Sequence, residues 1–214
     1  MPITISRISP QKNKKNRYSL YSDETFIIGI SEEVLISFGI FKGCQINDDT
    51  LQKIKEEEYL ISIRNQGLRF LARRPHSIKQ LKDKLIHKDF KRNYIDLIIN
   101  EFLRQKYLDD NEFSRLFIRE EMKIKKNGPL LIKNKLIARG INPEKASVMI
   151  GEIYNEKSQN DNCLEIAEKK LKALAKYPDQ EKKRKLAVFL KQKGYYWETV
   201  QQALQKLIIT DAAY

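Results

Sequence analysis

The chain has 214 residues, and its 41 lysines and arginines against 28 aspartates and glutamates give a net charge of +13, which attracts nucleic acid, anionic membranes and acidic protein surfaces. Two cysteines are too few for a disulfide framework, and no apolar run approaches the roughly 18–20 residues that span a bilayer. Because the N-terminus is also too polar for a signal peptide, these features exclude secreted and membrane-spanning proteins and predict a soluble, cytoplasmic protein.

The N-terminal part of the chain is predicted to form a small α/β extension. Three segments are rich in β-branched and aromatic residues, as short strands are: ITISRI (3–8), RYSLY (17–21) and TFIIGI (25–30). Ser31 is placed to cap a short helix that ends at Gly39, and FKGCQI can add a further small strand. These patterns predict a small sheet with one helix packed on it.

From about Asp48 onward the hydrophobic period is that of helices. This residue or Asp49 is expected to cap a helix through TLQKIKEEE. A second helix is predicted from about Glu57 to Arg74, where Pro75 stops it. The rest of the chain is predicted to be almost entirely helical.

Helix-start signals recur along this helical part. Ser77 and Gln80 form a capping box, and Asp109 with Glu112 can cap a later helix in the same reciprocal way. Pro143 is expected at the first position of another helix, where the N–H that proline lacks has no intrahelical partner. These signals divide the helical part into successive short helices.

One apolar pattern occurs three times in the helical part. Its members follow one another at spacings of 4, 5, 5, 4 and 4 residues: Leu81, Leu85, Phe90, Ile95, Ile99 and Leu103; Ile132, Leu136, Ile141, Ala146, Ile150 and Tyr154; Leu186, Leu190, Tyr195, Val200, Leu204 and Ile208. Directly before the third member stand Asp89, Gly140 and Gly194. Glycine suits a left-handed helix end, which aspartate tolerates less well, so each copy predicts a helix, a tight corner and a second helix.

A further helix is expected before each of these pairs, near residues 57–74, 112–126 and 162–176. We therefore predict a mainly α fold of three tandem three-helix repeats in an elongated, curved array, in which each repeat buries its apolar stripe partly against its neighbours. The predicted limits are 1–56 for the strand-containing extension and 57–110, 111–157 and 158–214 for the three repeats.

Basic side chains occupy the helix faces that the apolar stripes leave to solvent. Arg69 and Arg73 are four residues apart and therefore share one face. Solvation explains many of these residues one by one, but it does not explain an unneutralised excess of bases in all three repeats. The candidate binding residues are Arg69, Arg73, Arg74, Lys79, Lys82, Lys84, Arg115, Arg119, Lys123, Lys125, Lys126, Lys182, Lys183 and Arg184.

No catalytic constellation can be assembled from the sequence. The two histidines, His76 and His87, lack the spacing of a metal site. Asp109 and Asp110 are explained as the start of a helix, and Cys163 has no base near it in the sequence. Glycine-rich phosphate-binding loops are absent as well. We therefore predict a binding protein that is not an enzyme and uses no cofactor or metal.

Three stretches make the chain resemble the RecX family of recombination regulators. They are LARRPHSIKQLKDKL, which begins at Leu71, YLDDNEF at the end of the first repeat, and NGPLLIKNKLIARGI in the second. The start RYSLYSDETFIIGISEEVL is similar to an N-terminal extension found in one branch of that family. The chain departs from the family pattern at Gln80, where an acid is usual, and at Asp89, where glycine is usual.

The resemblance implies a cytoplasmic monomer that binds the RecA recombinase, mainly as its filament on DNA. Such a protein restrains filament growth, ATP hydrolysis and strand exchange without catalysing a reaction, and it has no membrane partner. The candidate basic residues would then contact the recombinase or its DNA, and binding to bare DNA would be weak and non-specific. The alternative is a basic helical-repeat nucleic-acid-binding protein without a recombinase partner, which would bind naked DNA as well as any filament.

Overall fold

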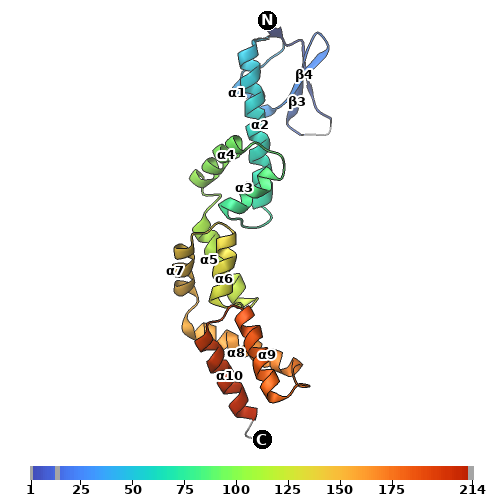
Figure 1. Cartoon of the computed structure of the whole chain (residues 1–214). Helices are drawn as coiled ribbons and strands as arrows, with labels where there is room; N and C mark the ends of the chain where they lie inside the picture. Colours follow the sequence, from blue (N-terminus) through green and yellow to red (C-terminus); the bar gives the residue numbers. More distant parts are fainter. Residues whose placement is uncertain (1, 13–14, 212–214) are drawn as a thin grey trace. The chain divides into compact units, whose positions relative to one another are not determined.

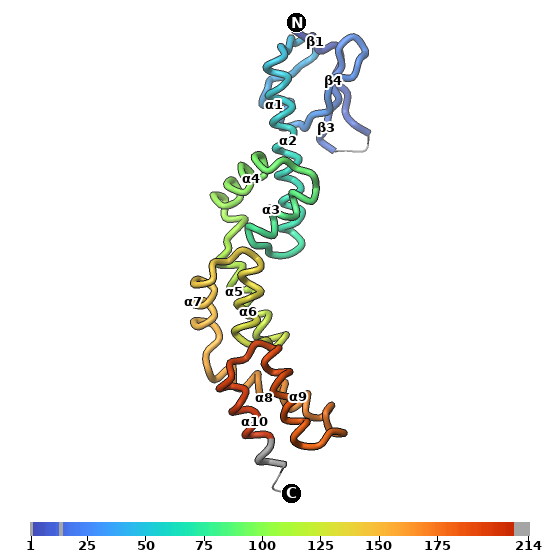
Figure 2. Tube along the Cα trace, in the orientation of Figure 1, coloured from blue at the N-terminus to red at the C-terminus, as the bar shows by residue number. Residues whose placement is uncertain are grey.

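The computed structural model of the chain describes residues 2–12 and 15–211, with side chains described as far as Leu207. Within these residues all five strands precede residue 47, and ten helices make up most of the rest (Figure 1, Figure 2). The predicted fold class, mainly α with a small strand-containing N-terminal extension, is confirmed. Among the described helices, none combines the length and the apolar composition that crossing a bilayer requires.

The N-terminal strands form two small antiparallel sheets. One sheet joins β1 to β5, and the other has the strand order β2-β3-β4. The strands are β1 (Ile3–Thr4), β2 (Arg7–Pro10), β3 (Arg17–Ser22), β4 (Thr25–Ser31) and β5 (Gln45–Ile46). The prediction of one strand over residues 3–8 was wrong because the chain changes sheets between Ile5, which donates its N–H to the Cys44 carbonyl, and Ser6, which donates to that of Tyr21.

Helix α1 (Glu32–Ser37) follows β4 and begins at the predicted cap. The hydroxyl of Ser31 accepts the N–H of Val34 at 3.3 Å, and Gly39 has the predicted left-handed conformation, with φ of +58°. The buried core of this region consists of Ile5, Leu20, Ile30, Val34, Ile40, Ile46, Ile54 and Ile61. Because its last two members belong to the next helix, the strands, α1 and that helix share one core.

Helix α2 (Asp48–Leu71) is one continuous helix of 24 residues. The prediction of two helices over this stretch was therefore wrong, and so was the predicted cap. Asn47 caps the helix by accepting the N–H of Thr50 at 2.8 Å. Nothing in the segment breaks a helix, since it has no proline and its single glycine, Gly67, is buried. The helix ends three residues before Arg74, the end that was predicted.

The remaining helices are shorter. In chain order they are α3 (Ile78–Ile86), α4 (Arg92–Arg104), α5 (Asp110–Lys123), α6 (Pro129–Ala138), α7 (Pro143–Ile153), α8 (Glu156–Ala173), α9 (Asp179–Gln192) and α10 (Trp197–Asp211). The predicted capping box is confirmed, since Ser77 and Gln80 exchange backbone-to-side-chain hydrogen bonds of 3.3 and 3.2 Å. The Asp109 carboxylate caps α5 by accepting the N–H of Glu112 at 3.4 Å. Pro143 is the first residue of α7, as predicted.

The threefold apolar pattern marks buried positions in most cases. All six members in α6–α7 are buried, as are the first five in α9–α10, whereas the side chain of Ile208 lies outside the described residues. Leu103 was predicted wrongly: it is 37% exposed, and its neighbour Phe102 is fully buried instead. The corner residues are left-handed as predicted, with φ of +61°, +88° and +86° at Asp89, Gly140 and Gly194.

The chain forms two compact units. Unit 1 consists of Met1–Arg73 and Leu85–Glu101, and unit 2 of Arg74–Lys84 and Phe102–Tyr214. Within unit 2, α5–α7 bury one apolar cluster and α8–α10 bury another. The limits of the three repeats remain a prediction.

A candidate basic binding surface

The positive charge of the chain belongs mainly to unit 2. Unit 1 contains 14 lysines and arginines and 12 aspartates and glutamates. Unit 2 contains 27 lysines and arginines and 16 aspartates and glutamates. Unit 1 therefore has a net charge of +2, and unit 2 has +11. A polyanion is attracted to unit 2 much more strongly than to unit 1.

The fourteen predicted binding residues differ in how freely they can bind a partner. Arg69 and Arg73 belong to unit 1, and the others belong to unit 2. Lys82 and Lys84 are half-buried. Six residues are exposed and form no ion pair within the described part of the chain: Arg69, Arg73, Arg119, Lys123, Lys183 and Arg184. These six are the best candidates for contact with a partner.

Several other candidates already bond within the chain. Lys126 bonds to Glu165 at 2.9 Å and to the side-chain oxygen of Asn162 at 2.8 Å. Arg115 lies 4.0 Å from Glu152, and Lys182 lies 2.9 Å from Asp179. Lys79 donates to the carbonyl of Ala138 at 3.1 Å, and Arg74 donates to that of Pro75 at 3.1 Å. Exposed pairs of this kind stabilise a fold little, but each must be given up before its base can bind elsewhere.

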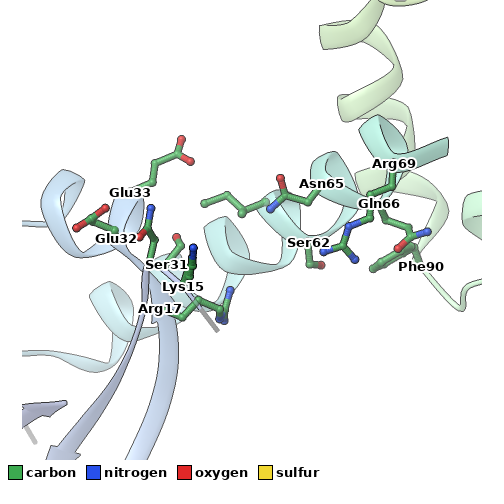
Figure 3. A pocket seen from close by; sticks show the side chains of 12 residues that line it. Lys15, Arg17, Ser31, Glu32, Glu33, Ser62, Asn65, Gln66, Arg69 and Phe90 are labelled. Carbon is green, nitrogen blue, oxygen red and sulfur yellow. The ribbon is translucent and has the colours of Figure 1, made fainter. Parts of the chain in front are cut away.

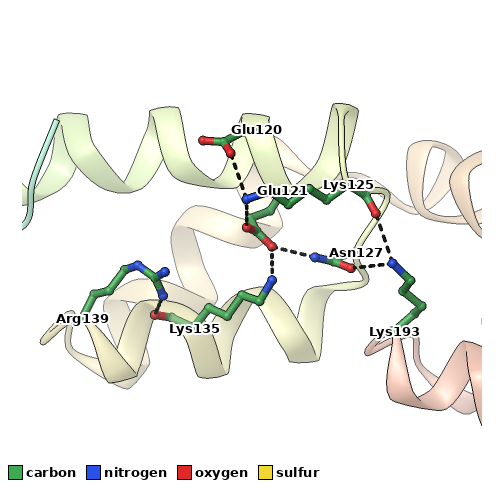
Figure 4. A network of polar contacts seen from close by, with 7 residues as sticks. All are labelled: Glu120, Glu121, Lys125, Asn127, Lys135, Arg139 and Lys193. Carbon is green, nitrogen blue, oxygen red and sulfur yellow. Dashed lines mark hydrogen bonds and ion pairs between the residues drawn. The ribbon is translucent and has the colours of Figure 1, made fainter. Parts of the chain in front are cut away.

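A buried carboxylate organises the basic side chains at the end of α5 (Figure 4). Glu121 is 1% exposed, and it accepts hydrogen bonds from Lys125 at 2.8 Å, Lys135 at 2.5 Å and Asn127 at 2.6 Å. Burial acts to raise the pKa of Glu121, but hydrogen bonds from these three donors outweigh burial and hold the pKa below its ordinary value. Asn127 accepts a further bond from Lys193 at 3.3 Å, so the network joins α5, α6 and the end of α9.

We expect Glu121→Gln to lower the free energy of unfolding at neutral pH by about 1–3 kcal/mol, because two ammonium groups lose an anionic acceptor. Since the folded pKa of Glu121 is lowered, its contribution is complete above the unfolded pKa and is lost as the pH falls through the folded pKa. The stabilities of the two proteins should therefore converge in acid.

Urea denaturation at pH 7 and at successively lower pH measures this difference. The control is Glu120→Gln, because the Glu120 side chain is 51% exposed and, within the described residues, forms an ion pair with Lys125 alone. A stability difference for Glu121→Gln that stays constant from neutral to acidic pH would contradict the assignment.

The corners of successive helix pairs pack on helix starts in the same way. The N–H of Gly128, before α6, donates to the Lys193 carbonyl at 2.7 Å. At the equivalent place before α3, the hydroxyl of Ser77 donates to the Arg139 carbonyl at 2.7 Å. Lys193 and Arg139 thus hold the same repeat position, each directly before a corner glycine. The repeat therefore brings one basic residue to each of these junctions.

Each junction contains a groove lined by basic side chains. A groove of about 260 Å³ is lined by Arg74, Lys125 and Arg139, and the Arg139 guanidinium lies 4.4 Å from the ring centre of Phe117. A second groove of about 540 Å³ is lined by Lys125, Lys135 and Lys193. Ammonium and guanidinium groups in such a setting bind phosphate or carboxylate. Sequence reasoning missed Lys135, Arg139 and Lys193, although the repeated corner position is a signal for the last two.

Unit 1 contains a larger and differently charged groove, of about 840 Å³ (Figure 3). One wall is a polar face of α2: Ser62, Asn65, Gln66 and Arg69. The other wall consists of residues around the start of β3 and the junction of β4 with α1, among them Lys15, Arg17, Ser31, Glu32 and Glu33. Arg69 lies at one end of the groove beside Phe90, and Glu33 lies at the other (Figure 3). Of the two candidates in unit 1, Arg69 lines this groove and Arg73 does not.

Three family profiles match parts of the chain. They are described as "Regulatory protein RecX N-terminal domain" over residues 3–47, "RecX, first three-helix domain" over 64–102, and "RecX, third three-helix domain" over 158–204. Together they cover the strand-containing extension and the first and last of the predicted repeats.

Curated relatives and solved structures carry the same name. A "Regulatory protein RecX" of Clostridium tetani is 30% identical over 97% of this chain and 95% of its own length. One of Clostridium acetobutylicum is 31% identical over 95% of this chain and 96% of its own. A crystal structure of regulatory protein RecX superposes with a TM-score of 0.76 at 21% identity, covering 95% of this chain and 98% of the other. The crystal structure of RecX from Lactobacillus salivarius superposes with a TM-score of 0.64 at 24% identity, covering 72% of this chain and 99% of the other.

Proposed function

This chain belongs to the RecX family of regulatory proteins, and from that premise we propose that it binds the RecA recombinase as its filament on DNA. Bound there, as a cytoplasmic monomer, it restrains filament growth, ATP hydrolysis and strand exchange. It acts by occupying the filament and catalyses no reaction of its own.

The observation that carries the proposal is the charge of +11 on unit 2. A nucleoprotein filament offers both DNA phosphates and acidic protein side chains, and lysine and arginine bind either. Arg119, Lys123, Lys183 and Arg184 are exposed in unit 2, and Arg139 and Lys193 line the junction grooves. A set of repeated basic positions suits a partner that is itself a repeating polymer.

The direct test is ATP hydrolysis by the matching recombinase on single-stranded DNA, measured with and without this protein. Inhibition, together with tighter binding to the filament than to bare DNA, is the expected result. If hydrolysis is unchanged and the protein binds bare DNA as tightly as the filament, the alternative holds: a nucleic-acid-binding protein without a recombinase partner.

Binding to bare single-stranded DNA should be weak, tolerant of sequence and strongly dependent on salt. Each neutralised phosphate contributes about −0.7 to the log–log slope of affinity against salt concentration. Replacing two exposed bases of unit 2, Arg119→Gln with Lys123→Gln, should therefore make the slope shallower by about 1.4. Fluorescence titrations over a range of salt concentrations measure it.

The matched control is Lys42→Gln with Lys53→Gln, which removes the same charge from exposed positions of unit 1. It should leave the slope nearly unchanged. An affinity that does not respond to salt, or a tight preferred DNA sequence, would contradict this part of the proposal.

A further inference from the structure

We propose that the groove of unit 1 binds an extended polypeptide segment of the protein partner, with an acidic side chain of that segment at Arg69 and a basic one at Glu33. The inference rests on the proposed function for the existence of a protein partner. It goes further in giving the strand-containing extension a role, which is to form one wall of a peptide-binding groove.

The α2 wall has the chemistry that a peptide backbone requires. Ser62, Asn65, Gln66 and Arg69 are spaced by three, one and three residues, so they lie on one face of the helix. All four line the groove, and all but the half-buried Gln66 are exposed. A side-chain amide offers both donors and an acceptor, so two adjacent amides can pair with the N–H and C=O groups of an extended chain.

The charges of the groove favour a polypeptide over a nucleic acid. Arg17 is neutralised by Glu58 at 2.9 Å, which also accepts the N–H of Ser31. Among the described residues that line the groove, the remaining charges are Lys15 and Arg69 against Glu32 and Glu33, and these four balance. A phosphate backbone needs an excess of bases along its whole path. A polypeptide that carries charges of both signs is complementary to a groove with an arginine at one end and glutamates at the other.

The dimensions set the spacing of the two charges in the bound segment. From Ser62 to Arg69 the helix rises about 10 Å, at about 1.5 Å per residue. An extended chain covers that distance in about three residues. Glu33 lies beyond the Ser62 end of this wall (Figure 3), so the acidic and basic side chains of the segment are expected to be at least about four residues apart.

Photo-crosslinking distinguishes a bound polypeptide from bound DNA. The photoreactive residue p-benzoylphenylalanine replaces Ser62, which is exposed and lies inside the groove. The control position is Lys53, which is exposed on the same helix but nine residues away, and therefore on its opposite side. Each protein is irradiated with recombinase filaments assembled on single-stranded DNA, and the products are mapped by mass spectrometry.

Position 62 is expected to form crosslinks to the recombinase polypeptide at least tenfold more efficiently than position 53, at a segment with the stated charges. Crosslinks to DNA would overturn the inference, as would equal yields from the two positions while the protein still inhibits ATP hydrolysis. If the protein neither binds filaments nor affects hydrolysis, the proposed function fails and this inference fails with it.

A second measurement avoids the bulky probe. Asn65→Ala with Gln66→Ala should weaken affinity for the filament about tenfold and leave affinity for bare single-stranded DNA unchanged. The unit 2 variant Arg119→Gln with Lys123→Gln serves as the comparison, because it should weaken binding to bare DNA. If the groove variant loses affinity for the filament and for bare DNA to the same extent, the inference is overturned.

Discussion

Reversing Arg69 on α2 together with Arg73 just beyond its end (Arg69→Glu with Arg73→Glu) is expected to abolish inhibition of the recombinase while the melting temperature stays nearly unchanged. Both side chains are exposed, and neither forms an ion pair with another described residue. Because α2 ends at Leu71, Arg73 follows the helix, and the prediction that it shares a helix face with Arg69 was wrong. The arginine fork grips carboxylate and phosphate alike, so reversal replaces attraction by repulsion. Substitutions at such surface positions change stability by about 0.5 kcal/mol or less, and loss of inhibition would therefore not reflect unfolding.

ATP hydrolysis on single-stranded DNA measures the effect, and circular dichroism checks the fold. The control is Lys53→Glu with Lys55→Glu, which makes the same charge change at exposed positions of the same helix outside the groove. Because Arg69 lines the groove and Arg73 does not, Arg69→Glu alone should account for most of the loss. If the control weakens inhibition as much as the double reversal, net charge alone is responsible and the site assignment is wrong.

Gly194→Ala is expected to lower the free energy of unfolding by about 2–5 kcal/mol. The residue has φ of +86°, a conformation that costs a non-glycine residue about 1–2 kcal/mol. An added Cβ would also overlap the backbone nitrogen of Leu131 at the start of α6, and forcing atoms into a packed site costs a further 1–3 kcal/mol. The packing of this corner on α6 thus leaves no room for a side chain.

Urea denaturation measures the loss, and the chain supplies two controls. Gly151 lies in α7 with nothing within 4 Å of an added Cβ, so Gly151→Ala should stabilise by about 0.5–1 kcal/mol. Asp89 is an exposed corner residue with φ of +61°, so Asp89→Gly should be neutral or slightly stabilising. If Gly194→Ala changes the free energy of unfolding by no more than Gly151→Ala does, the corner has room for a side chain and the prediction is wrong.

The parts of the fold that depend on local chemistry could be predicted from the sequence. Ser31, the Ser77–Gln80 pair and Pro143 start helices through bonds within one turn of chain, and a corner glycine takes its conformation from its own lack of a side chain. Aspartate is tolerated at position 89 because its side chain is exposed and only the left-handed backbone conformation disfavours it. At Gly140 and Gly194 an added Cβ would also overlap Lys79 or Leu131.

The features that depend on distant residues could not be predicted. The burial of Ile54 and Ile61 in α2 depends on the strands, with which they share a core. Leu103 and Phe102 are adjacent apolar residues, and only the packing of α4 decides that the phenylalanine is buried.

The candidate site shows the same division. The sequence gives the positions of the bases and, through their spacing, which of them share a helix face. It does not show that Lys126 pairs with Glu165, 39 residues away in the chain, or that Glu121 gathers Lys125 and Lys135 around one carboxylate. Bases that serve the fold and bases that remain for a partner therefore look alike in the sequence.

The division of the chain between the two units has a consequence for its biosynthesis. Residues 74–84 belong to unit 2, although the chain on either side of them belongs to unit 1. Ser77 bonds to Arg139, which follows it by 62 residues. A ribosome adds about 5–20 residues per second, so this segment waits roughly 3–12 s after it is made before its partner exists. All residues of unit 1 have been synthesised once residue 101 has been added. Residues 74–84, which lie between its two segments in the sequence, must then wait for the middle of unit 2 to be translated, and until then they are open to chaperones and proteases.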